Sequence, residues 1–199
     1  MSAAKMPAVC RSTVLIRSLA LLGMAAPAAA EVSEKLDTVY YEVRAETRHN
    51  LLALLNEASP VRVNGKVFHA YTSWNVQWRF YWYEQADGRC AITRTHTDLT
   101  GEITLPRLAG STDRPLHEDF QGYAAALRTH ELGHYQIGKE AARAIDLALQ
   151  RLPQMASCKE LERVANRSAR EILDSHTARE RQYDIDTGHG KTQGAWLTR

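Results

Sequence analysis

The residues from Pro115 to Leu149 carry a helical repeat of apolar side chains, and this repeat constrains the fold more than any other part of the sequence. The run Ser111-Thr112-Asp113 offers helix N-cap residues, Pro115 suits the first helical turn, and Pro153 ends the pattern. A long helix with one apolar face packs on another layer of structure. The side chains on this face are Phe120, Tyr123, Leu127, His130, His134, Ile137, Ala141, Ile145 and Leu149.

His130, Glu131 and His134 form the pattern HExxH within this helix. Positions i and i+4 lie one above the other, so both histidines can direct a ring nitrogen at one cation about 2.0–2.1 Å away. At about 100° per residue, Glu131 lies about 100° around the helix from His130, whereas His134 lies only about 40° around. Glu131 is therefore poorly placed to bind the same ion, but it can take a proton from a water held there. The pattern favours a zinc hydrolase, and the alternative is a helix with two packed histidines.

A glycine inside the helix, Gly133, also needs an explanation, because each such glycine costs roughly 1 kcal/mol relative to alanine. It lies about 60° from His130, on the side away from Glu131. We expect the missing side chain to let another segment approach the metal-binding helix closely.

Catalytic zinc normally has three protein ligands and keeps one position for water, so the histidine pair needs a third donor. The segment from Tyr183 to Gly190 concentrates a histidine, two aspartates and a phenol after the last predicted helix. Its glycines allow a tight backbone path that would present His189 inward. His189 is the first choice as third ligand, Asp184 the second and Asp186 the third. The alternative is a frayed, solvated terminus.

Two residues of the preceding helix are weaker candidates for the third ligand. Glu171 would match the distant glutamate of gluzincin peptidases, and His176 would complete a three-histidine site. Glu171 lies between basic turns and is expected to form surface ion pairs, while His176 is expected to pack or cap. Metzincin architecture is disfavoured, because the residues after His134 lack its glycine and third histidine.

The chain before the HExxH helix is rich in predicted strands. Trp74, Val76, Trp78, Phe80 and Trp82 keep a period of two, which favours a sheet face packed on helices over a carbohydrate-binding platform. The predicted fold is α+β: a mostly antiparallel sheet packed on the HExxH helix and a second C-terminal helix, all within one domain of residues 31–199. The expected elements are strands at Thr38–Arg44, within Arg62–Trp82, at Cys90–Thr95 and at Gly101–Leu105 (ended by Pro106), and helices at His49–Glu57 and Lys159–Arg181.

Residues 1–30 have the pattern of a secretory signal peptide. Three basic residues precede an apolar stretch from Leu19 to Ala26, and a small-residue run fits cleavage after Ala30. The stretch is too short for a membrane anchor, which needs about 20 apolar residues. Its loss removes three of 25 basic residues and none of 23 acidic ones, leaving 22 against 23. No basic run that suggests nucleic acid and no membrane-spanning segment remains, so we expect a periplasmic or secreted protein.

Cysteine usage agrees with export. Cys10 leaves with the signal peptide, and the mature chain keeps an even pair, Cys90 and Cys158. In an oxidising compartment we expect these two to form a disulfide between the β-rich half and the connection of the two C-terminal helices. The alternative is two separate buried thiols.

The sequence also resembles a known family. His130-Glu131-Leu132-Gly133-His134, the terminal Tyr183-Asp184-x-x-Thr187-x-His189-Gly190, the Trp74-x-Val76-x-Trp78 strand and the cysteine pair are similar to secreted bacterial zinc-dependent peptidases long known only as a domain of unknown function. The resemblance covers nearly the whole mature chain. It implies a zincin-like α+β fold, with metal at the HExxH helix and the terminal segment as part of the site. It does not identify a substrate.

Together these patterns predict a zinc-dependent hydrolase, in the first place a peptidase acting on peptides or proteins. His130, His134 and His189 would hold Zn²⁺, with Asp184 as the alternative third ligand, and Glu131 would activate the water.

Three further residues would support this site. Asp184 or Asp186 would orient a ligand histidine by accepting its other ring N–H, and Tyr183 would donate to the oxyanion. Two other functions fit the same residues: a non-catalytic, zinc-stabilised module that binds a partner in the envelope, and an amidase that acts on cell-wall peptides.

Overall fold

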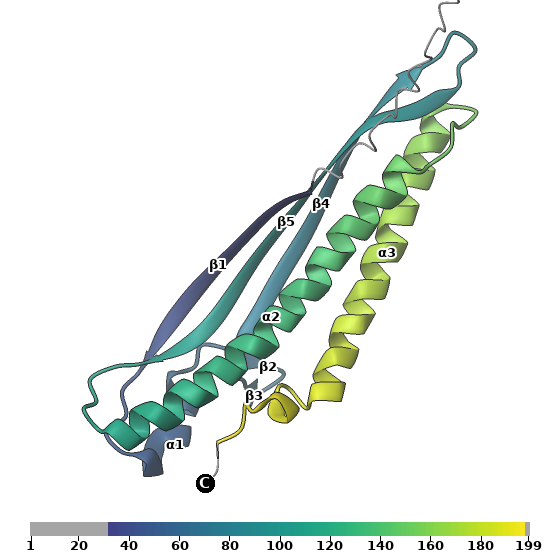
Figure 1. The fold of residues 1–199 in the computed structure, drawn as a ribbon. Helices are drawn as coiled ribbons and strands as arrows, with labels where there is room; N and C mark the ends of the chain where they lie inside the picture. The colour runs from purple at the N-terminus through teal and green to yellow at the C-terminus, as the bar shows by residue number, and fades with distance from the viewer. Residues whose placement is uncertain (1–31, 198–199) are drawn as a thin grey trace, which may run out of the picture.

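The computed structural model describes residues 32–197, and the predicted signal peptide lies outside this range. The fold is α+β, as predicted: a sheet forms one layer and two long antiparallel helices, α2 and α3, form the other (Figure 1). The elements are β1 (Val32–Val43), η1 (Arg48–Asn50), α1 (Leu51–Ala58), β2 (Arg62–Val63), β3 (Lys66–Val67), β4 (Tyr71–Glu84), β5 (Cys90–Leu108), α2 (Arg114–Gln150), α3 (Cys158–Thr187) and η2 (Lys191–Gln193).

The main sheet has the strand order β1-β5-β4, and β2 pairs with β3 in a small separate hairpin. Strand β5 pairs antiparallel with β4 and parallel with β1, and the β2–β3 pairing is antiparallel. The main sheet is therefore mixed, with one antiparallel and one parallel pairing, and not mostly antiparallel as predicted.

The strand predictions at Cys90–Thr95 and Gly101–Leu105 are confirmed, and the residues between them also belong to the same strand, β5. Its intervening residues alternate between the buried side chains of Thr97 and Leu99 and more exposed polar ones, which is the pattern of a half-buried strand. Pro106 does not end the strand. Pairing with β4 stops at Thr104. Pro106 has no N–H to donate, but it faces no β4 residue, so every β4 carbonyl keeps its partner.

The aromatic face of β4 packs on the helices as expected, except at its end. Val76 belongs to the core cluster that includes side chains of α2 and α3, and the partly buried Trp74, Trp78 and Phe80 pack against it. Trp82 is 44% exposed. A register shift between Tyr81 and Trp82 explains the difference, because a bulge turns the following side chains away from the face they would otherwise share.

The helix boundaries show one error that bears on the site. Helix α2 begins after Asp113, one of the three predicted cap residues, whose side chain accepts a hydrogen bond from the Leu116 N–H. Helix α3 continues six residues beyond the expected Arg181 and ends at Thr187, where Gly188 adopts the left-handed conformation with φ 56°. Tyr183, Asp184 and Asp186 therefore lie on a helix and not in a tail.

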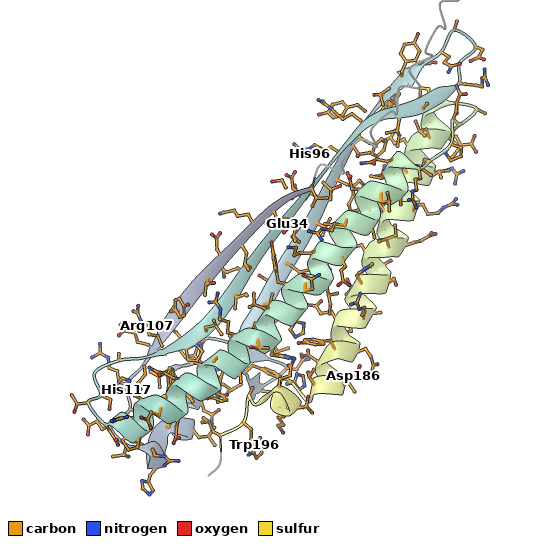
Figure 2. All side chains as sticks on the ribbon, viewed as in Figure 1. Glu34, His96, Arg107, His117, Asp186 and Trp196 are labelled. Atoms are coloured by element: carbon orange, nitrogen blue, oxygen red, sulfur yellow. A yellow bond between two sulfur atoms is a disulfide. The ribbon has the colours of Figure 1, made fainter. Side chains whose placement is uncertain are left out.

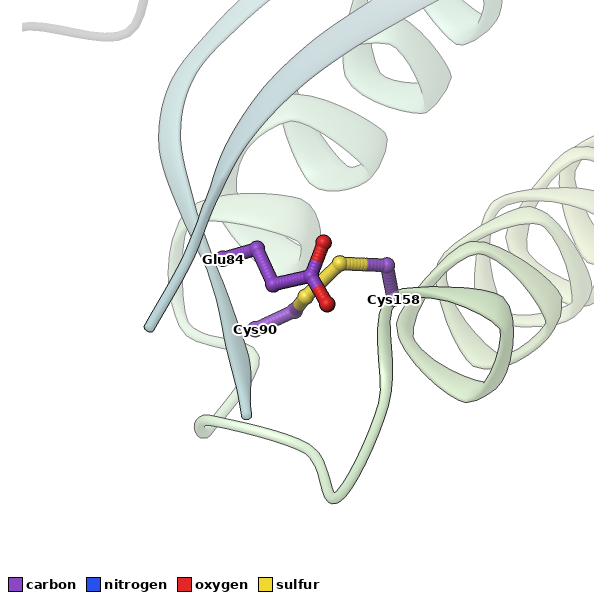
Figure 3. A group of neighbouring side chains, drawn as sticks. All are labelled: Glu84, Cys90 and Cys158. Carbon is purple, nitrogen blue, oxygen red and sulfur yellow. A yellow bond between two sulfur atoms is a disulfide. The ribbon is translucent and has the colours of Figure 1, made fainter. Parts of the chain in front are cut away.

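Cys90 and Cys158 form the predicted disulfide, which joins the start of β5 to the first residue of α3 (Figure 3). The bond closes a loop with a sequence separation of 68, which the chain-entropy model values at about 4 kcal/mol. Glu84 lies beside it, but the two sulfurs are bonded to each other and offer no thiolate to a metal. The disulfide fits an extracellular location. Within residues 32–197, no helix is long and apolar enough to span a membrane.

Candidate metal centre

Two helices bring three potential ligand atoms together. His130 and His134 lie on the buried face of α2, 4% and 7% exposed, with their Nε2 atoms 3.2 Å apart. Asp184, near the end of α3, places Oδ1 at 3.2 Å from the first of these nitrogens and 3.1 Å from the second. Asp184, predicted as the second choice for third ligand, is thus the carboxylate that joins the histidine pair.

The other ring nitrogens of the two histidines face acceptors. His130 Nδ1 lies 3.0 Å from Gln193 Oε1, so this nitrogen carries the proton and donates it. His134 Nδ1 lies 3.5 Å from the Glu180 carboxylate, which favours the same tautomer. When both rings are neutral, both Nε2 atoms are acceptors, and they meet a carboxylate oxygen that is also an acceptor. Three lone pairs that converge in this way fit a cation, and the donor set of two imidazoles and one carboxylate is suited to zinc.

The carboxylates beside His134 stabilise its protonated form. Burial lowers the pKa of His134, but hydrogen bonds to Asp184 and Glu180 outweigh this effect and raise the pKa to about 9. Burial raises the pKa of Asp184, but hydrogen bonds from the two histidines outweigh it and hold the pKa well below its usual range. The site therefore favours positive charge among these residues, as a cation-binding site should.

Glu131 is 4% exposed and lies between α2 and β4. The Thr72 hydroxyl lies 2.7 Å from Glu131 Oε2 and 3.0 Å from the Glu131 carbonyl oxygen. Burial raises the pKa of this carboxyl, although the Thr72 hydrogen bond and the nearby histidines act in the opposite direction. A carboxylate with a raised pKa and one oxygen held by Thr72 is suited to accept a proton through its other oxygen.

Tyr183 explains the glycine inside α2. Its ring stacks on His130, with centroids 5.1 Å apart, and its hydroxyl donates to the His130 carbonyl at 3.3 Å. A Cβ atom at Gly133 would lie 2.1 Å from this hydroxyl, so the predicted close approach of another segment is confirmed. Tyr183 does not line the cavity beside the histidines. Its hydroxyl also accepts from Gln193, so its predicted role at an oxyanion has no support in this geometry.

Gly133→Ala is expected to destabilise the fold by about 2–3 kcal/mol, because the new methyl group overpacks the contact with Tyr183. Gly122→Ala is the matched control on the same helix, since a Cβ at this position meets nothing within 4 Å. The change also replaces a glycine, which disfavours a helix, by alanine. The control is expected to be neutral or to stabilise by up to about 1 kcal/mol. Urea unfolding of both variants tests this, and equal losses would contradict the packing explanation.

The remaining predicted site residues lie outside this group of three ligand atoms. His189 is more than half exposed and contacts the group from its edge, with Nδ1 3.2 Å from Asp184 Oδ1. Asp186 lies on the outer side of the last turn of α3 and accepts a hydrogen bond from Gln182 (Figure 2). Glu171 pairs with Arg167 on the surface, and His176 bonds the Ile172 carbonyl, as expected for residues outside the site.

Sequence reasoning missed three residues that hold the site. Glu180 faces His134 Nδ1 and accepts a hydrogen bond from the Trp74 indole at 3.0 Å. Gln193 binds His130, and Thr72 binds Glu131. Only Glu180 carried a signal, because it lies four residues before Asp184 and so shares a helical face with it. Thr72 and Gln193 lie in other elements, and no spacing relates them to HExxH.

The three ligand atoms and the Glu131 side chain open on one cavity of about 1050 Å³. Helix α2 and the start of β4 line it, together with the β2–β3 hairpin, the end of α3 and the C-terminal segment. An ion held here would therefore be accessible to a ligand and not enclosed by protein.

Comparison with known proteins gives a family and no activity. A model of the family described as "Bacterial protein of unknown function (DUF922)" matches residues 38–190, a range that includes HExxH and Asp184. No curated protein and no solved structure matches the chain. The chain belongs to the bacterial family of unknown function DUF922.

Proposed function

We propose that this protein is a zinc-dependent hydrolase of the periplasm or the cell exterior, and specifically a peptidase. The observation that carries the proposal is the convergence of His130, His134 and Asp184 beside the buried Glu131 carboxylate, in one open cavity. Three protein ligands with an accessible fourth position are typical of catalytic zinc, whereas structural zinc is enclosed by four.

The ligands and their supports have separate tasks. A zinc ion bound by His130, His134 and Asp184 would supply a Lewis acid that lowers the pKa of water and polarises a carbonyl group. Gln193 accepts a hydrogen bond from His130 Nδ1, and the Glu180 carboxylate lies 3.5 Å from His134 Nδ1, so both residues would help to orient the ligand histidines.

Glu131 moves the proton in this proposal. Thr72 fixes Oε2, which leaves Oε1 to take a proton from the attacking water. The same oxygen then returns the proton to the amine nitrogen that leaves when the peptide bond breaks. Burial of Glu131 favours this exchange, because a raised pKa brings the carboxyl closer to the pH at which it works.

Metal removal tests the proposal. We expect the purified protein to contain one zinc ion per chain, to cleave members of a mixed peptide library, and to lose cleavage on treatment with a chelator. Readdition of zinc should restore cleavage. The measurements are metal analysis of the protein and mass spectrometry of the digested library. Cleavage that persists in metal-free protein would contradict the proposal.

A non-catalytic zinc module is the second candidate, and the position of His189 favours it. His189 Nδ1 lies 3.2 Å from Asp184 Oδ1, so a small movement would add a fourth ligand and close the site. This candidate predicts one tightly bound zinc ion and no cleavage of any peptide.

A digest of purified cell wall tests the third function, the cell-wall amidase. An amidase would release fragments from the cell wall, whereas a general peptidase would cleave the peptide library and leave the cell wall intact.

A further inference from the structure

The cavity extends well beyond the metal ligands. Leu127 and Tyr123 line it and lie three and seven residues before His130 on the same face of α2, about 4.5 and 10.5 Å along the helix axis. Opposite them, the cavity is lined by the apolar side chains of α1, of the β2–β3 hairpin and of the C-terminal segment. We call this part the apolar section; the residues that define it are Leu52, Val63, Val67, Tyr123, Leu127 and Leu197.

The polar groups within the apolar section bind one another. His69 Nδ1 lies 2.6 Å from the Tyr123 hydroxyl, and His69 Nε2 lies 2.9 Å from Asn56 Oδ1. Burial lowers the pKa of His69, so its ring is neutral, accepts from Tyr123 and donates to Asn56. His69 therefore contributes no charge to the apolar section. The Tyr123 hydroxyl donates to His69, and His69 donates to Asn56, so neither donor is left for a ligand. The basic side chains among the described residues that line the cavity, Arg181 on α3 and Lys191 on η2, belong to other elements than α1 and the β2–β3 hairpin. Away from these two side chains, a charged group of a ligand would lose water in the apolar section without gaining a partner.

The apolar section is continuous with the chemistry at the metal centre. Ala70 lines the cavity two residues before Thr72, so both side chains point to the same face of the chain, and Thr72 holds Glu131. A ligand whose peptide bond lies at Glu131 would therefore place a neighbouring side chain against Ala70 and Leu127.

We propose that the apolar section binds a large apolar side chain, such as phenylalanine or leucine, next to the peptide bond that is cleaved. This inference rests on the proposed function and names its substrate class. Burial of such a side chain, relative to alanine, is expected to strengthen binding about 10- to 100-fold. Aspartate or lysine at the same position is expected to bind no better than alanine.

The test measures peptide binding and peptide cleavage separately. Fluorescent hexapeptides of glycine and alanine carry one variable residue, phenylalanine, leucine, alanine, aspartate or lysine, on either side of the central bond. Binding is measured with zinc-loaded Glu131→Gln protein, in which cleavage does not interfere, and cleavage with the wild-type protein. Phenylalanine and leucine peptides should bind most tightly and be cleaved first. Equal binding of the aspartate and phenylalanine peptides would overturn the inference.

A matched pair of variants locates the binding to the apolar section. Val63 is 42% exposed and lines it, and Val39 on β1 is 46% exposed and does not. In the Glu131→Gln background, Val63→Asp is expected to weaken binding of the phenylalanine peptide at least about tenfold, and Val39→Asp to leave it unchanged. Val67→Asp, on the same hairpin, is the second variant should the first not fold. If a folded hairpin variant behaves like Val39→Asp, the inference is wrong.

These outcomes also separate the inference from the proposed function. A binding preference without cleavage of any peptide would refute the peptidase and leave the apolar section as a binding site. Cleavage without a preference for apolar residues would keep the peptidase and refute the assignment of its substrate class.

Discussion

Glu131→Gln is expected to leave zinc bound and to reduce peptide cleavage by about 10²–10⁴-fold, which is the usual contribution of a positioned general base. Glutamine has nearly the same shape as glutamate and can still accept the Thr72 hydrogen bond, so the packing between α2 and β4 is kept. It cannot take up a proton from water. Because Glu131 is almost fully buried, removal of its charge should not lower the stability of the fold.

The measurement is the initial rate of cleavage at saturating zinc, together with the zinc content of each protein. Glu118→Gln is the matched control, since it makes the same change at an exposed position of the same helix, where Glu118 pairs with Arg114. The control should keep the wild-type rate. If Glu131→Gln keeps the wild-type rate as well, Glu131 is not the base and the mechanism is wrong.

Asp184→Ala is expected to weaken zinc binding several hundredfold. Structural zinc sites contribute about 10–16 kcal/mol in total, so the loss of one ligand among three or four removes about 3–4 kcal/mol. The variant also leaves two buried histidines without the carboxylate that now lies 3.1–3.2 Å from both. Competition with a chromogenic chelator gives the affinity directly and does not depend on activity.

His189→Ala separates the two candidates for the third ligand. The exposed position of His189, at the edge of the Asp184 carboxylate, predicts a loss of zinc affinity of about tenfold, typical of a group that supports a ligand. A loss as large as that of Asp184→Ala would make His189 a ligand, as the sequence had ranked it, and would favour the closed, non-catalytic site.

The sequence ranked His189 before Asp184 for a local reason, whereas in the structure Asp184 is the residue that joins the histidine pair. With the helix predicted to end at Arg181, Asp184 and His189 both fall in the same tail. Of the two, only His189 has a glycine on each side, which allows the backbone to turn it inward. The residues from Gln182 to Thr187 continue α3 instead, up to the left-handed Gly188. One more turn and a half of helix directs Asp184 at α2 and leaves His189 outside.

Other parts of the site were predicted because their cause is also local. The pairing of His130 with His134 follows from the pitch of one helix, and both were expected on its buried face from the apolar repeat. The open side of Gly133 was predicted as a place of close approach, and Tyr183 fills it. The sequence did not say which residue would do so, because contact between α2 and α3 depends on how two distant elements pack.

The sequence by itself therefore determined the α+β class, the HExxH pair, the buried face of α2 and the two cysteines that join. These follow from hydrophobic periodicity and helix pitch, which act over a few residues, and from an even pair of cysteines. Only the tertiary structure decided that Asp184 completes the group, that Glu180, Gln193 and Thr72 hold it, and that an apolar section opens beside it. Such contacts join residues 46 to 106 positions apart, and they exist only once the sheet and both helices have packed.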